Sequence, residues 1–286
     1  MPFRWFWLTK LIRERVVTTE ELEVRALQKL QTESRLKKGL ERAEFILHYQ
    51  PQIDLDSGKV IGMEALVRWE QPEMGLVPPL EFIPVAEETG LICPLGEWIL
   101  RTACQQTVEW IDAGFDSLKI SVNLSARQFS NTDFVDKVTA ILAETRLPPS
   151  LLEIEITESM VMENVDNTIA ILNKFKSEGI RISIDDFGTG YSSLSYLKKF
   201  PIHTLKIDKS FVRDLTVDSD DAAIIKAIVS LAHNLGLSII AEGAETSEQV
   251  KFLKKRKCES VQGYFFSRPL PPEEFLDFIK KNKKQK

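Results

Sequence analysis

Apolar and polar residues alternate in short runs from Phe45 onward, and longer stretches with apolar residues at helical spacing lie between these runs. Alternation at period two predicts strands, and apolar residues three or four apart predict helices. The predicted strands span residues 45–53, 59–69, 118–124, 152–156, 180–185, 204–207, 238–241 and 260–264. The predicted helices span residues 80–89, 95–113, 133–144, 162–178, 222–235, 247–255 and 272–280.

Strands that alternate with helices predict an α/β protein, and eight such strands favour a (β/α)₈ TIM barrel. Only the short stretch 54–59 joins the first two strands, which is room for a turn but not for a helix. We therefore predict a modified barrel with one antiparallel strand. A doubly wound sheet is the main alternative, but no GxGxxG follows the first strand.

The segment before the first strand has a different composition. Residues 3–17 mix aromatic, aliphatic and basic side chains, which is typical of a terminal packing helix or of a segment on a membrane surface. The charged stretch that follows, up to residue 43, predicts a linker helix. We divide the chain into residues 1–43, a barrel over 44–281 and a basic tail over 282–286. This organisation suggests an output module that is truncated or controlled by a separate sensor protein.

Charge and cysteine content exclude several classes of protein. The formal net charge is −5, which argues against nucleic-acid binding. Without the five lysines of residues 280–286 the rest of the chain carries −10, so an anionic substrate would require bound cations. The three cysteines form no CxxC pair, which predicts reduced thiols in a cytoplasmic protein. No run of about 18 apolar residues predicts a membrane span.

Polar residues lie at the ends of nearly every predicted strand. In a barrel these ends meet at one mouth, where active sites lie. The candidates are Glu64, Asn123, Glu155, Glu158, Asp185, Asp186, Lys206, Glu242 and Gln262. Asp185 and Asp186 begin the stretch Asp-Asp-Phe-Gly-Thr-Gly, whose glycines Gly188 and Gly190 permit a tight turn.

Five carboxylates against a single lysine determine the chemistry that we expect. Like charges about 4 Å apart repel by roughly 4 kcal/mol at an effective dielectric of about 20. Such a cluster stays protonated or binds cations. Oxygen ligands without cysteine or histidine favour two Mg²⁺ or Mn²⁺ ions, which serve phosphodiester hydrolysis by neutralising the ester and activating water.

Several motifs together resemble one known family. The residues Glu64-Ala65-Leu66-Val67-Arg68-Trp69 resemble the signature for which the EAL-domain cyclic di-GMP phosphodiesterases are named. The resemblance runs from about residue 44 to 271. It includes the motifs Tyr49-Gln50-Pro51, Glu155-Ile156-Thr157-Glu158, Leu205-Lys206-Ile207-Asp208, Ala241-Glu242-Gly243-Ala244-Glu245 and Gln262-Gly263-Tyr264.

The resemblance implies hydrolysis of cyclic di-GMP to linear pGpG with two Mg²⁺ or Mn²⁺ ions, and a homodimer. It implies that Glu64, Asn123, Glu155 and Asp185 hold one metal ion and that Asp185, Asp186 and Glu242 hold the second, with Asp185 shared. It implies catalytic roles for Lys206, Glu242 and Glu64, with Lys206 orienting the attacking water and Glu242 as the general base. Glu158 would anchor the loop at Gly188 and Gly190, and the substrate contacts would be Gln50, Arg68, Glu245 and Gln262.

Three alternatives stay open. A cyclic di-GMP receptor would bind the nucleotide without useful turnover, and another metal phosphodiesterase would prefer a different substrate. A glycosidase also uses paired carboxylates, but it needs neither a divalent ion nor Lys206. Metal dependence and the identity of the product distinguish these classes.

Overall fold

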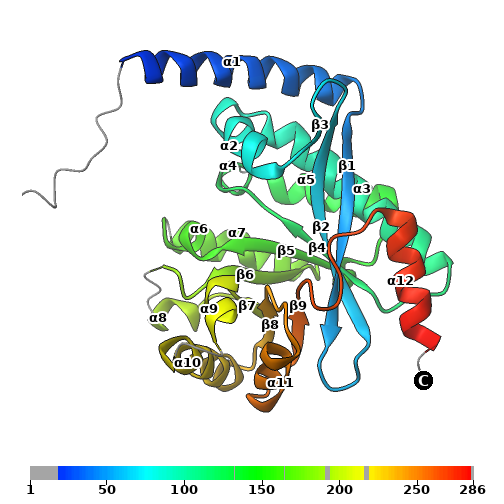
Figure 1. The fold of residues 1–286 in the computed structure, drawn as a ribbon, viewed down its shortest axis with the longest axis vertical. Helices are drawn as coiled ribbons and strands as arrows, with labels where there is room; N and C mark the ends of the chain where they lie inside the picture. The colour runs from blue at the N-terminus through cyan, green and yellow to red at the C-terminus, as the bar shows by residue number, and fades with distance from the viewer. Residues whose placement is uncertain (1–18, 132, 164, 191–193, 216–218, 285–286) are drawn as a thin grey trace, which may run out of the picture.

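The structure is a computed structural model that describes residues 19–131, 133–163, 165–190, 194–215 and 219–284 (Figure 1). The aromatic and basic segment 3–17 of the sequence prediction lies outside these residues. Among the described helices, none is both long enough and apolar enough to cross a membrane.

Eight strands form a closed ring. They are β1 (Phe45–Asp54), β2 (Val60–Gln71), β4 (Lys119–Asn123), β5 (Leu152–Thr157), β6 (Arg181–Phe187), β7 (Thr204–Ile207), β8 (Ser238–Glu242) and β9 (Ser260–Gln262). The ring closes because β1 pairs with both β2 and β9. All eight predicted strands are therefore confirmed, and closure of the sheet excludes the open doubly wound alternative.

Strand β1 is the antiparallel member of the ring. It runs antiparallel to β2 and to β9, whereas successive pairs from β2 through β9 are parallel. The turn between Asp54 and Val60 is too short to carry the chain back for a parallel pairing. A further strand, β3 (Gly75–Val77), pairs with β2 outside the ring and was not predicted.

Helices cover the outside of the ring (Figure 1). The longer ones are α2 (Pro79–Thr89), α3 (Ile92–Asp112), α5 (Phe134–Thr145), α7 (Val165–Ser177), α10 (Ser219–Leu235), α11 (Ser247–Lys255) and α12 (Pro272–Lys284). The predicted linker helix corresponds to α1 (Thr19–Glu41), which packs on α2. Helix α12 continues to Lys284, so the described part of the segment 282–286 is helical rather than a separate tail.

The helix predicted over residues 162–178 is confirmed as α7 (Val165–Ser177), except that its predicted start falls in a separate short helix. The structure has α6 (Glu158–Glu163) directly after β5, and then α7. Three more short helices, α4 (Ala126–Phe129), α8 (Leu194–Leu197) and α9 (Lys209–Asp214), and the 3₁₀ turn η1 (Pro149–Leu151) were not predicted. Each of these is too short to show a helical period in the sequence.

The strands are buried on both faces, and the two faces differ in chemistry. On β5, Leu152, Ile154 and Ile156 belong to the hydrophobic core, and the alternating Glu153 and Glu155 are equally buried. Bulky aliphatic side chains usually fill the interior of a TIM barrel. Here polar and charged side chains occupy it, and the site is built from them.

Candidate active site

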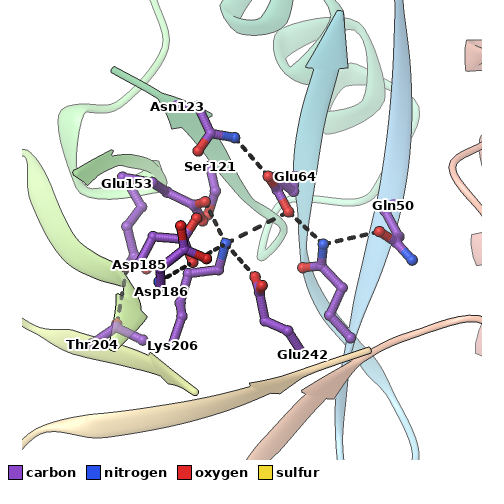
Figure 2. A network of polar contacts seen from close by, with 12 residues as sticks. Gln50, Glu64, Ser121, Asn123, Glu153, Asp185, Asp186, Thr204, Lys206 and Glu242 are labelled. Carbon is purple, nitrogen blue, oxygen red and sulfur yellow. Dashed lines mark hydrogen bonds and ion pairs between the residues drawn. The ribbon is translucent and has the colours of Figure 1, made fainter. Parts of the chain in front are cut away.

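Lys206 on β7 lies at the centre of the polar network inside the barrel (Figure 2). Its side chain is 0% exposed, and its Nζ atom contacts carboxylate oxygens from four different strands. The distances are 2.5 Å to Glu155, 2.6 Å to Glu242, 3.4 Å to Asp185 and 3.6 Å to Glu64. Four acids therefore share one buried cation.

The charges in this network are unbalanced. Burial alone would lower the pKa of Lys206, but the carboxylates around it raise that pKa well above its usual value, so the lysine stays protonated. Burial is also the main reason why the pKa of Glu155 lies well above its usual range, although Lys206 opposes this rise. The excess of acid over base thus favours protons or added cations in the site.

Amide side chains orient Glu64. Asn123 Nδ2 donates to Glu64 Oε1 at 2.6 Å, and Gln262 Nε2 donates to Glu64 Oε2. Gln262 Nε2 also donates to Gln50 Oε1 at 3.1 Å, and Gln50 Nε2 donates to the backbone oxygen of Ser267 at 3.2 Å. Both oxygens of Glu64 are held in place, so this carboxylate has a defined orientation.

A β-bulge places Asp185 and Asp186 at the mouth together. Ile184 pairs with Leu205 and Phe187 with Ile207, so β6 has one residue more than β7 between these two pairs. Asp186 has a φ of 54°, in the left-handed region that few non-glycine residues adopt. In a regular strand, adjacent side chains would point to opposite faces. The bulge lets both aspartates serve one site.

Asp185, Asp186 and Glu242 each present an oxygen within 4.8 Å of the others, which is the spacing of a shared cation site. Burial raises the pKa of Glu242 to about 8, and burial with the nearby Asp185 and Asp208 raises that of Asp186 to about 6. Both groups thus hold protons more strongly than ordinary carboxyls. A divalent cation that replaces those protons would find hard oxygen ligands already gathered.

The unpaired polar atoms are consistent with a cation site. Glu155 Oε1 is buried and has no hydrogen-bond partner in the described residues, although Oε2 of the same carboxylate contacts Lys206. An unsatisfied buried carboxylate oxygen is costly, and a coordinated cation would satisfy it. The donor set consists of carboxylate and amide oxygens, as Mg²⁺ and Mn²⁺ prefer.

Glu158 at the start of α6 holds the glycine loop after β6. Its side chain is buried, and its Oε2 accepts a hydrogen bond from the backbone nitrogen of Gly188 at 2.8 Å. Gly188 has a φ of 101°, and a Cβ atom there would lie 2.9 Å from Phe211. A Cβ atom at Gly190 would lie 2.9 Å from Glu158 Oε1. Both glycines allow the loop to lie against Glu158.

A cavity of about 370 Å³ adjoins Glu242 at the mouth. Its lining includes Gln50, Glu242, Glu245, Gln262 and Tyr264. The cavity therefore combines hydrogen-bonding side chains with an aromatic ring beside the acidic cluster.

The side-chain hydrogen bond of Arg68 points away from the cluster. Arg68 lies on β2, four residues after Glu64, and its Nη1 donates to the backbone oxygen of Val67 at 2.8 Å. The structure brings the other predicted metal and catalytic residues together around Lys206, and it places Glu245 in the adjoining cavity.

The sequence prediction missed three polar residues near the site. They are Gln52, Ser121 and Asp208. Gln52 follows Gln50 by two positions on β1 and therefore faces the same side of the strand. The alternation of side chains along β1 could have identified Gln52 in the sequence.

A closed α/β barrel with a buried acidic cluster at its mouth defines the structural class, and comparison with known proteins gives the family. The family model described as EAL domain matches residues 33–269. The chain belongs to this family.

Two relatives come from Pseudomonas aeruginosa. The chain is 48% identical over 255 residues to the bifunctional diguanylate cyclase/cyclic di-GMP phosphodiesterase MucR, covering 89% of this chain and 37% of MucR. It is 43% identical over 262 residues to the cyclic di-GMP phosphodiesterase NbdA, covering 92% of this chain and 34% of NbdA. The chain thus spans about a third of the length of these relatives.

A solved structure agrees with the family. The structure of the PaMucR phosphodiesterase in complex with c-di-GMP matches with a TM-score of 0.84 and 48% sequence identity. The match covers 86% of this chain and 99% of the PaMucR chain.

Proposed function

We propose that this chain is a phosphodiesterase that hydrolyses cyclic di-GMP to linear pGpG with two Mg²⁺ or Mn²⁺ ions. The cluster of four carboxylates around the buried Lys206 carries the proposal, because it needs added cations and lies beside an open cavity. The names of MucR and NbdA, and the c-di-GMP in the matching PaMucR structure, support this choice of substrate.

Two groups of side chains would hold the cations. Glu64, Asn123, Glu155 and Asp185 would form one site, and Asp185, Asp186 and Glu242 would form the other, with Asp185 shared. The unpaired Oε1 of Glu155 and the spacing of the second group support this division. Divalent cations held there supply positive charge to the phosphodiester and to the attacking water.

Lys206 and Glu242 would divide the work on the attacking water. The Lys206 ammonium, fixed by its carboxylate contacts, can donate a hydrogen bond to a phosphate oxygen or to the water. The Glu242 carboxylate, which lies beside Lys206, can accept a proton from that water. The proton is then available for the departing sugar oxygen.

Substrate binding would involve the cavity beside Glu242. Glu245 and Gln50 line it and offer acceptors and donors to a nucleobase, and Tyr264 offers a ring face. Arg68 lies further along β2 from Glu64, where a change of side-chain conformation would allow it to pair with a phosphate.

The contact between Glu158 and Gly188 would connect the second metal site with the protein surface. Only Phe187, the last residue of β6, separates Gly188 from Asp186, so a displacement of Gly188 reaches the metal ligands within three residues. We propose a homodimer that acts on this loop, and an upstream regulatory domain or separate sensor protein. A cytoplasmic location also stays a prediction.

The direct test is hydrolysis of cyclic di-GMP with Mg²⁺, Mn²⁺, Ca²⁺ or EDTA, with the products separated by chromatography. We expect pGpG with Mg²⁺ or Mn²⁺ and no turnover in EDTA. Glu64→Ala should abolish turnover and keep cooperative unfolding, because it removes an inner carboxylate and leaves the outer core intact. Binding of cyclic di-GMP without turnover would instead identify a receptor, and cleavage of other diesters only would identify a different phosphodiesterase.

A further inference from the structure

Gln52 on β1 is buried at the base of the site, one layer below Gln50. Its Nε2 donates to Gln262 Oε1 at 3.3 Å and lies 3.5 Å from Ser121 Oγ. Gln262 in turn donates from Nε2 to Glu64 and Gln50. Gln52 therefore contacts the group that orients Glu64 and does not itself contact the carboxylate cluster in any recorded hydrogen bond.

The direction of this amide chain is determined at both ends. Gln50 donates to a backbone carbonyl oxygen, which can only accept, and Glu64 as a carboxylate also only accepts. Gln262 must therefore direct its amino group toward Glu64, and its carbonyl oxygen points toward Gln52. With the amide rotated by half a turn, the Gln262 oxygen would face a carboxylate and its amino group would face the amino group of Gln52.

The backbone leaves space for Gln52. Gly62 lies opposite Gln52 in the pairing of β1 with β2. A Cβ atom at Gly62 would lie 2.8 Å from Gln52 Oε1 and 3.1 Å from the backbone oxygen of Lys119. The φ of Gly62 is not in the left-handed region, so space for the Gln52 amide explains this glycine better than backbone conformation does.

We propose that Gln52 is a positioning residue that strengthens the preference of the Gln262 amide for the orientation that Glu64 and Gln50 select, and so keeps Glu64 turned toward the cation site. Without the Gln52 donor, the carbonyl oxygen of Gln262 is buried and unpaired, and the two amide orientations come closer in free energy. The proposal deepens the proposed function and rests on it only for the part that concerns turnover.

The central variant is Gln52→Met, which keeps the length of the side chain and removes the donor. We expect Mn²⁺ binding, measured by calorimetry, to weaken about tenfold and kcat to fall about tenfold with KM nearly unchanged, as is typical when a residue that orients a metal ligand is lost. The matched control is Gln71→Met. Gln71 is also a buried glutamine, but it lies on β2, and its amide oxygen accepts hydrogen bonds from the backbone nitrogens of Glu73 and Met74 at the turn to β3. It should lower stability without changing Mn²⁺ affinity.

A double-mutant cycle separates positioning from a general loss of packing. If Gln52 acts through Gln262, then Gln52→Met should change Mn²⁺ affinity less than about twofold in a Gln262→Met background. An undiminished tenfold effect in that background would overturn the proposal. So would a Gln52→Met protein that resembles Gln71→Met, with lower stability and unchanged affinity.

A third readout needs neither metal nor substrate. In protein labelled with ¹⁵N-glutamine, the Gln262 side-chain amide should shift and exchange its protons faster in Gln52→Met. An unchanged signal would contradict the proposal. If the variant shows this change but the wild-type protein does not hydrolyse cyclic di-GMP, the result would count against the phosphodiesterase function alone. If Gln52→Met fails to unfold cooperatively, Gln52→Leu provides the same test, because its apolar side chain also cannot donate.

Discussion

Ile154 and Glu155 are neighbours on β5, and both are almost completely buried, yet they belong to different parts of the molecule. Ile154 faces the helices and belongs to the hydrophobic core. Glu155 faces the barrel interior and contacts Lys206. The outer face of the barrel thus stabilises the fold through apolar burial, whereas the inner face carries the candidate chemistry.

The two faces also respond differently to the loss of a side chain. Removal of apolar atoms from a packed core costs free energy through lost burial and a cavity. Removal of one partner from a buried network of charges leaves the remaining charges uncompensated. The inner face therefore depends on charge balance, and four comparisons test this difference.

The largest effect on stability is expected for Lys206→Met. It removes the cation that contacts Glu64, Glu155, Asp185 and Glu242, so the metal-free protein at pH 8 should lose about 3–5 kcal/mol of unfolding free energy in urea titrations. Lys137→Met is the control, since its ion pairs with Glu97 and Asp133 are exposed to solvent, and it should leave the unfolding free energy nearly unchanged. Equal losses in the two variants would refute the central role of Lys206.

Much of this division between faces could be read from alternation in the sequence. The same period-two pattern that predicts β5 places Glu153 and Glu155 on one face and Ile154 and Ile156 on the other. The short turn 54–59 correctly predicted the antiparallel β1. The candidate residues at strand ends needed only one further rule, that such ends meet at the mouth of a barrel.

Other features depend on contacts between distant segments and could not be predicted. The bulge at Asp185 and Asp186 arises from pairing with β7, and the sequence of β6 alone continues its alternation through Ile184. Strand β3 has only three residues, which is too short for a period to appear. Gln262 lies in β9, far from Gln52 in sequence, so their contact needs the closed ring.

The second comparison uses the neighbours on β5. Ile154→Ala should cost about 2–5 kcal/mol of unfolding free energy because the removed atoms leave a cavity in the outer core, while kcat of the folded protein stays within about twofold of wild type. Urea titration and steady-state kinetics under conditions that keep the variant folded provide the two measurements.

Glu155→Gln is the partner variant, and it should show the reverse pattern. The neutral amide removes a buried carboxyl with a raised pKa, so the metal-free protein should become more stable at pH 8. Metal-dependent hydrolysis should be lost. If both variants lost stability and activity in the same proportion, the two faces would not differ as we argue.

The third comparison is the pH dependence of stability without metal. Glu242 and Asp186 have native pKa values of about 8 and about 6, above the value of about 4 for unfolded carboxyls. The native state therefore binds more protons than the unfolded state between about pH 4 and about pH 8. Its stability should fall as pH rises from about 5.5 through about 8. Urea titrations in EDTA test this fall. Glu242→Gln should reduce the slope, and a stability that rises over this range would contradict the assignment.

The smallest effect is expected at the edge of the inner face, where Glu158 holds the loop after β6. Glu158→Ala removes the acceptor of the Gly188 backbone nitrogen, so Asp185 and Asp186 are less firmly positioned and kcat should fall about tenfold. Ser159→Ala, the next position on α6 and an exposed one, should leave kcat within about twofold.

Hydrogen exchange at Gly188 provides a second measurement for Glu158→Ala that does not depend on turnover. This amide should exchange faster when its buried carboxylate acceptor is missing, whereas the β5 amides, which pair with β4 and β6, should keep their protection. Faster exchange throughout β5 would indicate global destabilisation rather than a released loop. Unchanged exchange at Gly188 would show that the carboxylate of Glu158 does not hold the loop. The network of the inner face would then extend along the chain only as far as Asp186 and would not include this loop.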